Sequence, residues 1–516
     1  MMQKFEMVAK TLMGLEQVLA EELRALGAEN IEPGRRMVSF WGDNEMLYKA
    51  NLCCRTALRI LKPFYKFEAH TPDQLYEMAK EYDWSTLLSL DKTFCIDTVA
   101  YSDDFTHSHF VTYRVKDAIC DWFRDRFDDK RPGVRLADAD IMINVHISGG
   151  NVTFSLDSSG ESLHKRGYRV AQTEAPINEV LAAGIILMSG WRGEVPFVDP
   201  MCGSGTFLIE AALIAANINP GVYRKSFAFE QWPDFDRDLF DRLYNDDSQE
   251  RPVTCPIVGA DISQAALDIA TRNVKSAGVG KYVTLERKPI AHWEDSPKPA
   301  GVLITNPPYG ERISSADMEG LYSMIGNRLK FAFQGYHAWI IGYRDEYFIK
   351  IGLSPSQKIP VLNGQLECEL REYIIFDGDK KSFLAGGGKL KADRPAREDR
   401  RDRPRRDDKF DRRDRKDSSN RFTSRRDDRF EKRDKFEKRD RFDKRDKFDK
   451  RDRFDKRDKF DRKPDFEKPQ EAPSENPLAV RRNPGALKMI KNRQPSLPPT
   501  EVTMRKRGWR KKDDQD

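Results

Sequence analysis

The stretch that decides the fold is Val198-Asp-Pro-Met-Cys-Gly-Ser-Gly-Thr206. It follows an apolar run that predicts a buried strand, and it leads directly into a helical pattern from Phe207 to Ala216. Glycines in such a turn let a ligand approach the backbone closely, and the free N–H groups at a helix start favour a carboxylate. The strand, the turn and the helix together predict a cofactor site.

The spacing of the glycines excludes two common phosphate loops. A dinucleotide fingerprint requires a third glycine where Leu208 stands, and a P-loop requires a lysine that is absent here. An acid followed by Gly-x-Gly is typical of an S-adenosylmethionine (SAM) site, and Asp261 is expected to hold the ribose hydroxyls from the end of the next strand. The predicted cofactor contacts are Asp199, Pro200, Cys202, Gly203, Gly205, Thr206, Asp261, Ile262 and Asn306.

A second segment, Ile304-Thr-Asn-Pro-Pro-Tyr-Gly310, indicates the chemistry. An exocyclic amino group on a base is a poor nucleophile because its lone pair is delocalised into the ring. The Asn306 side-chain oxygen and the Pro307 carbonyl could accept its hydrogens, while Tyr309 offers a face on which a flipped base can stack. Carbon methylation of cytosine would require a cysteine beside the proline, and none is present. The predicted catalytic residues are Asn306, Pro307, Pro308 and Tyr309.

Charge divides the chain into two parts. Residues 379–516 contain 49 Lys and Arg against 31 Asp and Glu, a net charge of +18, which leaves 41 against 53 and a net of −12 for residues 1–378. An acidic body joined to a basic tail suggests a polyanionic partner that is engaged partly through the tail.

The cysteines and the apolar runs restrict the class of protein further. The seven cysteines form no disulfide framework, and no spaced set of cysteines and histidines indicates zinc, so we expect no metal site. No apolar run approaches the roughly 18 residues of a membrane span, and the N-terminus lacks a signal-peptide pattern. We therefore expect a cytoplasmic protein with no membrane contact.

The N-terminal part predicts two α+β segments. Residues 1–50 show a strand, an amphipathic helix and a second strand, as in a ferredoxin-like unit. Residues 51–157 are mixed, with a helix expected over 52–60 and a closing hairpin formed by 141–147 and 152–156.

Residues 158–190 are predicted to be a basic connector followed by an apolar lead-in helix. The polar part of this connector has two interpretations, phosphate contacts or a solvated linker, and the residue types do not distinguish between them. The candidate RNA contacts are His164, Lys165, Arg166 and Arg169, together with Arg312 from the second motif.

Residues 191–378 alternate strands and helices, which predicts a doubly wound α/β sheet. The strands are expected near 196–200, 256–262, 282–287, 301–306 and 337–343, followed by a terminal antiparallel hairpin of 358–362 and 368–376. An insertion at 217–255 contains aromatic residues, for which a local core is the first interpretation and a substrate lid the second.

The tail, residues 379–516, loses apolar periodicity from Gly386 onward and repeats a six-residue charged unit between Phe430 and Phe460. Six residues match neither a helix nor a strand period, so we expect a disordered tail. The repeat has two open interpretations, which are loose RNA contact through arginine and phenylalanine and a purely solvating role. Residues 504–512 are the better candidate for RNA contact.

These motifs resemble those of the THUMP-containing guanine-N2 RNA methyltransferases, and most closely the N-terminal half of the long 23S rRNA members. The resemblance covers residues 1–378, and the element order of 51–157 resembles a THUMP domain. The matching segments are Ser159-Gly-Glu-Ser-Leu-His-Lys-Arg-Gly-Tyr-Arg169, Ala175-Pro-Ile-Asn-Glu179, Asp199-Pro-Met-Cys-Gly-Ser-Gly-Thr206, Asn306-Pro-Pro-Tyr-Gly-Glu-Arg312 and Leu362-Asn-Gly-Gln-Leu-Glu-Cys368.

The resemblance implies a Rossmann-like methyltransferase that transfers a methyl group from SAM to N2 of a guanine in 23S rRNA, on the rRNA or a large-subunit assembly intermediate. Two departures stand out: Lys288-Pro-Ile290 replaces the acid that many relatives place against the adenine, and the second methyltransferase half of the long members is replaced by the tail. Backbone groups at 288–290 or Asp295 are the alternative adenine contacts. A tRNA guanine-N2 enzyme, an adenine-N6 enzyme and an assembly factor with a vestigial SAM site remain alternatives.

Overall fold

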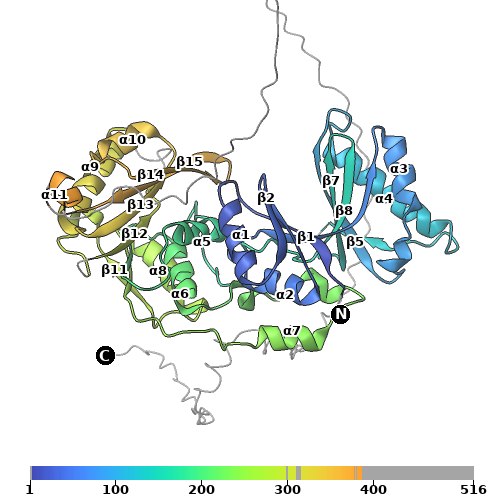
Figure 1. Ribbon diagram of the computed structural model, residues 1–516, viewed down its shortest axis with the longest axis horizontal. Coiled ribbons are helices and arrows are strands. Elements are labelled where there is room, and N and C mark those ends of the chain that lie inside the picture. Colours follow the sequence, from blue (N-terminus) through green and yellow to red (C-terminus); the bar gives the residue numbers. More distant parts are fainter. Residues whose placement is uncertain are drawn as a thin grey trace, which may run out of the picture. The chain divides into compact units, whose positions relative to one another are not determined.

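The structure, a computed structural model, describes residues 3–136, 138–297, 300–308, 315–376, 378 and 380–385. Two sheets organise them (Figure 1). Tyr309, Arg312 and the repeat of the tail, for which predictions were made above, lie outside the described residues.

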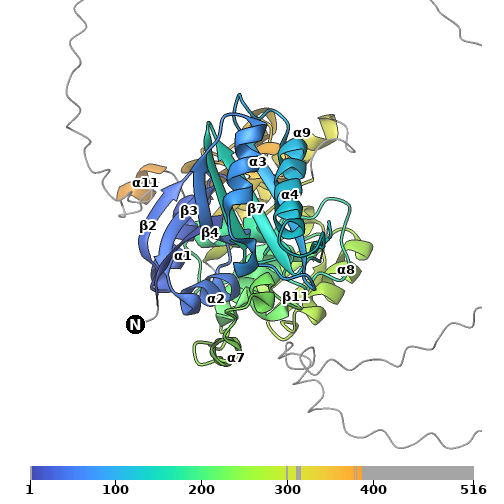
Figure 2. The ribbon, with the colours of Figure 1, turned by 90° about the vertical axis from the view of Figure 1, so that its right-hand side faces the viewer.

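The first sheet has eight strands and belongs to the N-terminal part of the chain. Its order is β2 (Glu29–Gly34), β3 (Met37–Gly42), β1 (Phe5–Lys10), β4 (Arg59–Glu68), β8 (Asn151–Asp157), β7 (Ile141–Ser148), β5 (Thr93–Tyr101) and β6 (Gly133–Val134). The helices of this part are α1 (Glu16–Ala25), α2 (Asn44–Cys53), α3 (Pro72–Glu81) and α4 (Ser108–Arg124). Helices α3 and α4 lie side by side against one face of the sheet (Figure 2).

The strands of 1–50 and 51–157 share this sheet, because β1 pairs with β4 through Val8 and Leu61. The expected helix over 52–60 is wrong. Helix α2 ends at Cys53, and β4 begins at Arg59. Pro63 lies at a register shift between β4 and β8, where a strand tolerates a proline. Strand β4 forms because it pairs with β1 and β8, and the local sequence pattern does not record these pairings.

The second sheet contains the glycine turn and has the doubly wound order that the sequence predicts. The order is β11 (Val283–Arg287), β10 (Ile257–Asp261), β9 (Phe197–Asp199), β12 (Gly301–Thr305), β13 (Tyr336–Gly342), β15 (Leu366–Ile374) and β14 (Gln357–Asn363). The first five strands are parallel, and β15 and β14 form the predicted antiparallel hairpin. The chain reverses its direction of winding between β9 and β12, and ligands bind at such a switch point.

Alternate residues of the central strands face the two layers of helices. Phe197 packs with α5 (Glu179–Met188), α6 (Thr206–Ala216) and α8 (Gln264–Ser276). Its neighbour Val198 packs with α9 (Ser315–Ala332) and α10 (Asp345–Lys350). Burial on both faces explains why these strands read as continuous apolar runs. The remaining helical elements are η1 (Trp84–Thr86), η2 (Pro220–Tyr223), η3 (Ala228–Gln231), α7 (Arg237–Tyr244), η4 (Ile290–His292) and α11 (Lys380–Ala385).

The aromatic insertion forms a core, as the first interpretation expected, but that core is shared with α2. Phe229 stacks on Tyr48 with ring centroids 4.6 Å apart, and Phe240 packs edge-on against Phe229 at 5.2 Å. Both phenylalanines are buried in the same cluster as the first sheet. The insertion therefore packs against the N-terminal part of the chain.

Arg224, which lies in this insertion, holds the connector after β8. Its guanidinium donates to the carbonyl oxygens of Ser159 (3.0 Å), Glu161 (2.6 Å), Ser162 (3.1 Å) and Lys165 (3.0 Å). The side chain is buried, and burial lowers the pKa of Arg224 to about 10. A buried cation that satisfies four carbonyl groups is a strong structural constraint.

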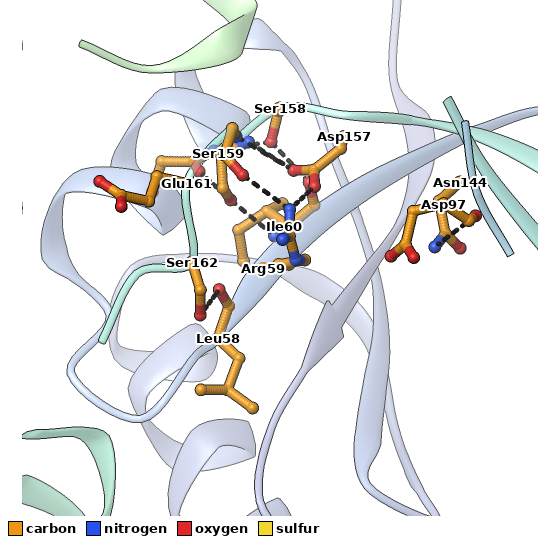
Figure 3. A network of polar contacts seen from close by, with 12 residues as sticks. Leu58, Arg59, Ile60, Asp97, Asn144, Asp157, Ser158, Ser159, Glu161 and Ser162 are labelled. Atoms are coloured by element: carbon orange, nitrogen blue, oxygen red, sulfur yellow. Dashed lines mark hydrogen bonds and ion pairs between the residues drawn. The ribbon is translucent and has the colours of Figure 1, made fainter. Parts of the chain in front are cut away.

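The start of the connector is also bonded to β4 (Figure 3). Ser158 Oγ donates to the Ile60 carbonyl at 2.7 Å, and the Ile60 N–H donates to Ser159 Oγ at 2.9 Å. Arg59 pairs with Asp157 and donates to the Gly160 carbonyl at 2.6 Å. The connector is therefore a fixed part of the fold and not a solvated linker.

Replacing Arg224 by alanine should lower the free energy of unfolding by about 2–4 kcal/mol, because four carbonyl groups of the connector lose a buried charged donor. Urea denaturation followed by fluorescence measures this change. Arg242→Ala, which removes an exposed arginine of α7, is the matched control and should change the free energy by less than about 0.5 kcal/mol. Equal stability of the two variants would contradict the role given to Arg224.

Candidate active site

The two sequence motifs meet at one edge of the second sheet. Strands β9 and β12 are parallel neighbours, with Val198 paired to Leu303, so their carboxyl ends lie at the same edge. The Thr305 hydroxyl donates to Asp199 Oδ1 at 2.9 Å. Two segments about a hundred residues apart in the chain are thus in direct contact.

Asp199 is a fully enclosed carboxyl group. It is 1% exposed and accepts hydrogen bonds from Thr305 and from the Met201 N–H at 3.2 Å. Burial raises the pKa of Asp199 to about 7, although both hydrogen bonds act in the opposite direction. This carboxyl group therefore titrates near neutral pH, and a cation bound nearby would favour its charged form.

The two glycines of the turn after β9 differ in their surroundings: Gly205 is in close contact with a helix, and Gly203 has space beside its Cα. Gly205 has φ +80°, and a Cβ there would lie 3.2 Å from the Ala270 Cβ of α8, so only glycine permits this close helix contact. Gly203 has φ +53°, and nothing lies nearer to an added Cβ than Thr173 Oγ1 at 4.0 Å. Space for a ligand against the backbone therefore lies at Gly203.

Asp261 stands at the end of β10 and reaches the same turn. Its Oδ2 accepts the Gly203 N–H at 2.9 Å, and its Oδ1 accepts the Ser263 N–H at 2.9 Å. Each carboxylate oxygen retains a further acceptor site, and a pair of such sites suits two adjacent hydroxyl groups. The partly exposed Asp261 beside the open Gly203 fits the ribose of the predicted SAM.

The other predicted cofactor residues of the two strand ends differ in how exposed they are to solvent. Pro200, Cys202 and Thr206 are buried, whereas Ile262 is exposed. Burial raises the pKa of the Cys202 thiol, so it stays protonated and is not a nucleophile.

The segment that replaces the usual adenine acid lies beside Asp261. The Lys288 N–H donates to the Asp261 carbonyl at 3.2 Å, and Lys288 Nζ lies 4.3 Å from the centre of the Trp293 ring. Asp295 is exposed. The backbone of 288–290 is thereby placed next to the residue predicted to bind the ribose.

The second motif follows β12 directly. Asn306 is partly exposed, Pro307 is buried and Pro308 is exposed. Asn306 is therefore adjacent in the chain to Thr305, the residue that contacts Asp199. The structure brings the predicted catalytic loop and the predicted cofactor turn together at this point.

The connector residues predicted to contact RNA have other partners. Arg166 is 2% exposed and donates to the carbonyl groups of Leu163 and Arg55, which leaves it no accessible face for a phosphate and corrects that prediction. Arg169 donates to Glu179 at the start of α5, as described below. His164 is half-buried against Ser162, with 2.8 Å between Nδ1 and Oγ, and only Lys165 is well exposed, paired with Glu161.

Two residues of this site were missed in the sequence. Thr305 and Asn273 are both buried and polar, and both hydrogen-bond to residues of the glycine turn or its acid. A threonine at the end of an otherwise apolar strand, directly before the catalytic motif, was the available signal. Asn273 had no local signal, because its partners are distant in the chain.

Two further findings concern ligands and membranes. In the part of the chain that the structure describes, no group of three or more His, Cys, Asp or Glu is arranged to hold a metal ion. No described helix combines the length and apolar character needed to cross a membrane.

Comparison with known proteins assigns each part of the described chain. Residues 6–61 match the RlmL ferredoxin-like domain, 69–157 match the THUMP domain, and 166–372 match the RMKL-like methyltransferase domain. A putative RNA methyltransferase of Synechocystis, slr0064, is 39% identical over 366 residues that cover 70% of this chain and 95% of the relative. The chain belongs to the RMKL-like methyltransferase family. The resemblance to THUMP-containing methyltransferases is thereby confirmed.

Two other similar proteins are a longer relative and a solved structure that contains a ligand. The ribosomal RNA large subunit methyltransferase K/L of Syntrophotalea carbinolica is 38% identical over 376 residues, which cover 70% of this chain but 52% of that protein. The chain thus spans about half the length of that relative. The crystal structure of SMU.472, a putative methyltransferase complexed with SAH, matches with a TM-score of 0.65 and 33% identity and covers 73% of this chain and 100% of that one.

Asp199→Asn should change how stability depends on pH. The fold raises the carboxyl pKa from 3.8 to about 7, so it favours the neutral form. The contribution of Asp199 to stability is therefore fully present below about pH 4 and is lost as pH rises towards 7, by on the order of 4 kcal/mol. Asparagine keeps both acceptor contacts and does not titrate.

Urea denaturation at intervals between pH 4 and 8 measures this difference. Relative to wild type, the Asp199→Asn variant should gain stability as pH rises through that window. Asp268→Asn, which changes an exposed acid of α8, is the control and should run parallel to wild type. A parallel curve for Asp199→Asn would mean that this carboxyl is already charged in the fold.

Proposed function

We propose that this protein transfers a methyl group from SAM to the N2 amino group of a guanine in 23S rRNA. It would act in the cytoplasm on the rRNA or on a large-subunit assembly intermediate. The observation that carries the proposal is the contact between Thr305 and Asp199, since it joins the predicted base loop to the predicted cofactor turn.

The cofactor assignment is supported by the chemistry of the turn. The open backbone at Gly203 and the free acceptor sites of Asp261 suit the ribose of SAM. The related SMU.472 structure contains SAH, the product that SAM leaves after methyl transfer. When bound, SAM supplies a methyl group on a sulfonium sulfur.

The protein's own part in the reaction is to hold the amino group. Asn306 Oδ1 and the Pro307 carbonyl would each accept a hydrogen bond from the amino group. These two bonds would direct the nitrogen lone pair towards the methyl carbon. The amino nitrogen held in this way would take the methyl group with release of SAH, and the amino proton would pass to water. Neither metal nor covalent enzyme intermediate enters this balance.

The RNA substrate is supported by the domain composition. A THUMP domain matches residues 69–157, and the relative of which this chain covers 52% is named for the large ribosomal subunit. The choice of guanine N2 rests on the resemblance of the five segments named above to the guanine-N2 family, because adenine-N6 enzymes share the loop type of Asn306-Pro-Pro-Tyr309.

Asn306→Ala should lower turnover about 10²–10³-fold, as the loss of one preorganised polar group does in other enzymes. Binding of SAH, measured by calorimetry, should change little, because Asn306 is one of nine predicted cofactor contacts and the ribose contacts are expected at Asp261. The matched control is Arg242→Ala, an exposed change on α7. An Asn306→Ala variant with normal turnover would refute the role of this amide.

The substrate is tested by mass spectrometry of RNA from a deletion strain. The proposal expects one 23S rRNA guanine that lacks N2-methylation and that the purified protein methylates in vitro. Loss of N2-methylguanine from tRNA, or of N6-methyladenine, would assign one of the alternative substrates instead.

Removing residues 386–516 should weaken RNA binding and reduce its dependence on salt, while methyl transfer continues. The tail from 379 carries a net charge of +18, so its loss removes cations that displace counterions from RNA. Filter binding at several salt concentrations and transfer assays measure the two effects. Complete loss of transfer would favour the assembly-factor alternative.

A further inference from the structure

One arginine links the connector to the glycine turn. The guanidinium of Arg169 donates to Ser204 Oγ at 3.1 Å and to Thr206 Oγ1 at 3.0 Å, and these hydroxyls flank Gly205. The same group donates to Glu179 Oε1 at 2.6 Å and to the Ile177 carbonyl at 3.1 Å. Arg169 therefore joins the connector, the start of α5 and both sides of the turn through one planar group.

A buried amide makes the second link between the same segments. Asn273 of α8 is 1% exposed, and its Oδ1 accepts the Val170 and Ala171 N–H groups at 3.0 and 3.1 Å. Its Nδ2 donates to the carbonyl groups of Ala171 at 2.8 Å and Ser204 at 3.0 Å. The amide thus uses both its donors and accepts two hydrogen bonds, so its orientation is fixed.

These bonds bring the connector to the open glycine. Two residues beyond Ala171, Thr173 Oγ1 lies 4.0 Å from the position that a Cβ on Gly203 would take. The other end of the connector is held by β4 and by Arg224. The segment 158–173 therefore runs, fixed at both ends, from the THUMP-containing part to the cofactor turn.

We propose that Arg169 and Asn273 are positioning residues that hold the turn 203–206 in the conformation that binds SAM. They act through Ser204 and Thr206 and do not touch the RNA. This role rests on the proposed use of SAM, and it replaces the phosphate contact predicted for Arg169. It also makes the connector a wall of the cofactor site.

Arg169→Lys is the informative variant, because lysine preserves the charge opposite buried Glu179 but cannot span the four separated acceptors. Asn273→Ala removes the second link. Arg272→Ala is the matched control, since Arg272 is exposed and precedes Asn273 on the same helix. Thermal denaturation identifies any variant that does not fold.

Calorimetric titration with SAH, without RNA, is the deciding measurement. For folded Arg169→Lys and Asn273→Ala we expect the Kd for SAH to rise about tenfold or more, with Arg272→Ala unchanged. In transfer assays the KM for SAM should rise by a similar factor, while kcat at saturating SAM falls less than threefold.

The outcomes separate the two proposals. Wild-type affinity for SAH in both folded variants would overturn the positioning role alone, and so would a fall in kcat with unchanged KM. A wild-type protein that does not bind SAH would overturn the proposed function itself. If the methylated RNA is not 23S rRNA, the substrate assignment is wrong, but the conclusion drawn from SAH binding still holds.

Discussion

The parallel pairing of β9 and β12 is the constraint on which the site depends. It places the ends of two apolar strands at one edge of the sheet, where the backbone must turn and polar groups must find partners. Thr305 and Asp199 satisfy one another there, within a region from which water is excluded. Because Asp199 is buried, its proton affinity responds strongly to charges in the site. The position that holds the two motifs together is thus also electrostatically sensitive.

A second level of organisation links this site to the N-terminal part of the chain. Arg224, Arg166 and Arg169 are all basic and all at most slightly exposed, and each is bonded to acceptors within the protein. Such groups are costly to bury and are retained only where several partners compensate them. Arg166 and Arg169 lie within 158–173, and Arg224 bonds to this segment from the insertion, so together they hold the connector in place. A rigid connector keeps a THUMP-containing part at a fixed distance from the cofactor turn, which suits an enzyme that must deliver one nucleotide to one place.

The same arginines show the limit of reading charge from sequence. A run such as Lys165-Arg166 has the composition of a phosphate-binding segment, and composition carries no information on burial. Arg166 is buried, whereas its neighbour Lys165 is exposed. The difference arises from partners of Arg166 such as Arg55 and Glu210, which lie far away in the sequence. The helix expected over 52–60 failed for the same reason, since strand β4 is defined by its neighbours β1 and β8.

The amino-acid sequence by itself determined most of what depends on local periodicity and spacing, the helix expected over 52–60 excepted. This includes the strands of the doubly wound sheet, the hairpin at Asn363-Gly364, the glycine turn and the second acid, Asp261. Tertiary structure alone decided which polar side chains are buried and what they contact. Thr305 against Asp199 and Asn273 against Ser204 are contacts between distant segments, and they exist only after the strands have paired and α8 has packed on Gly205. A local pattern records the preference of a segment, whereas burial and hydrogen bonding depend on the partners that folding brings to it.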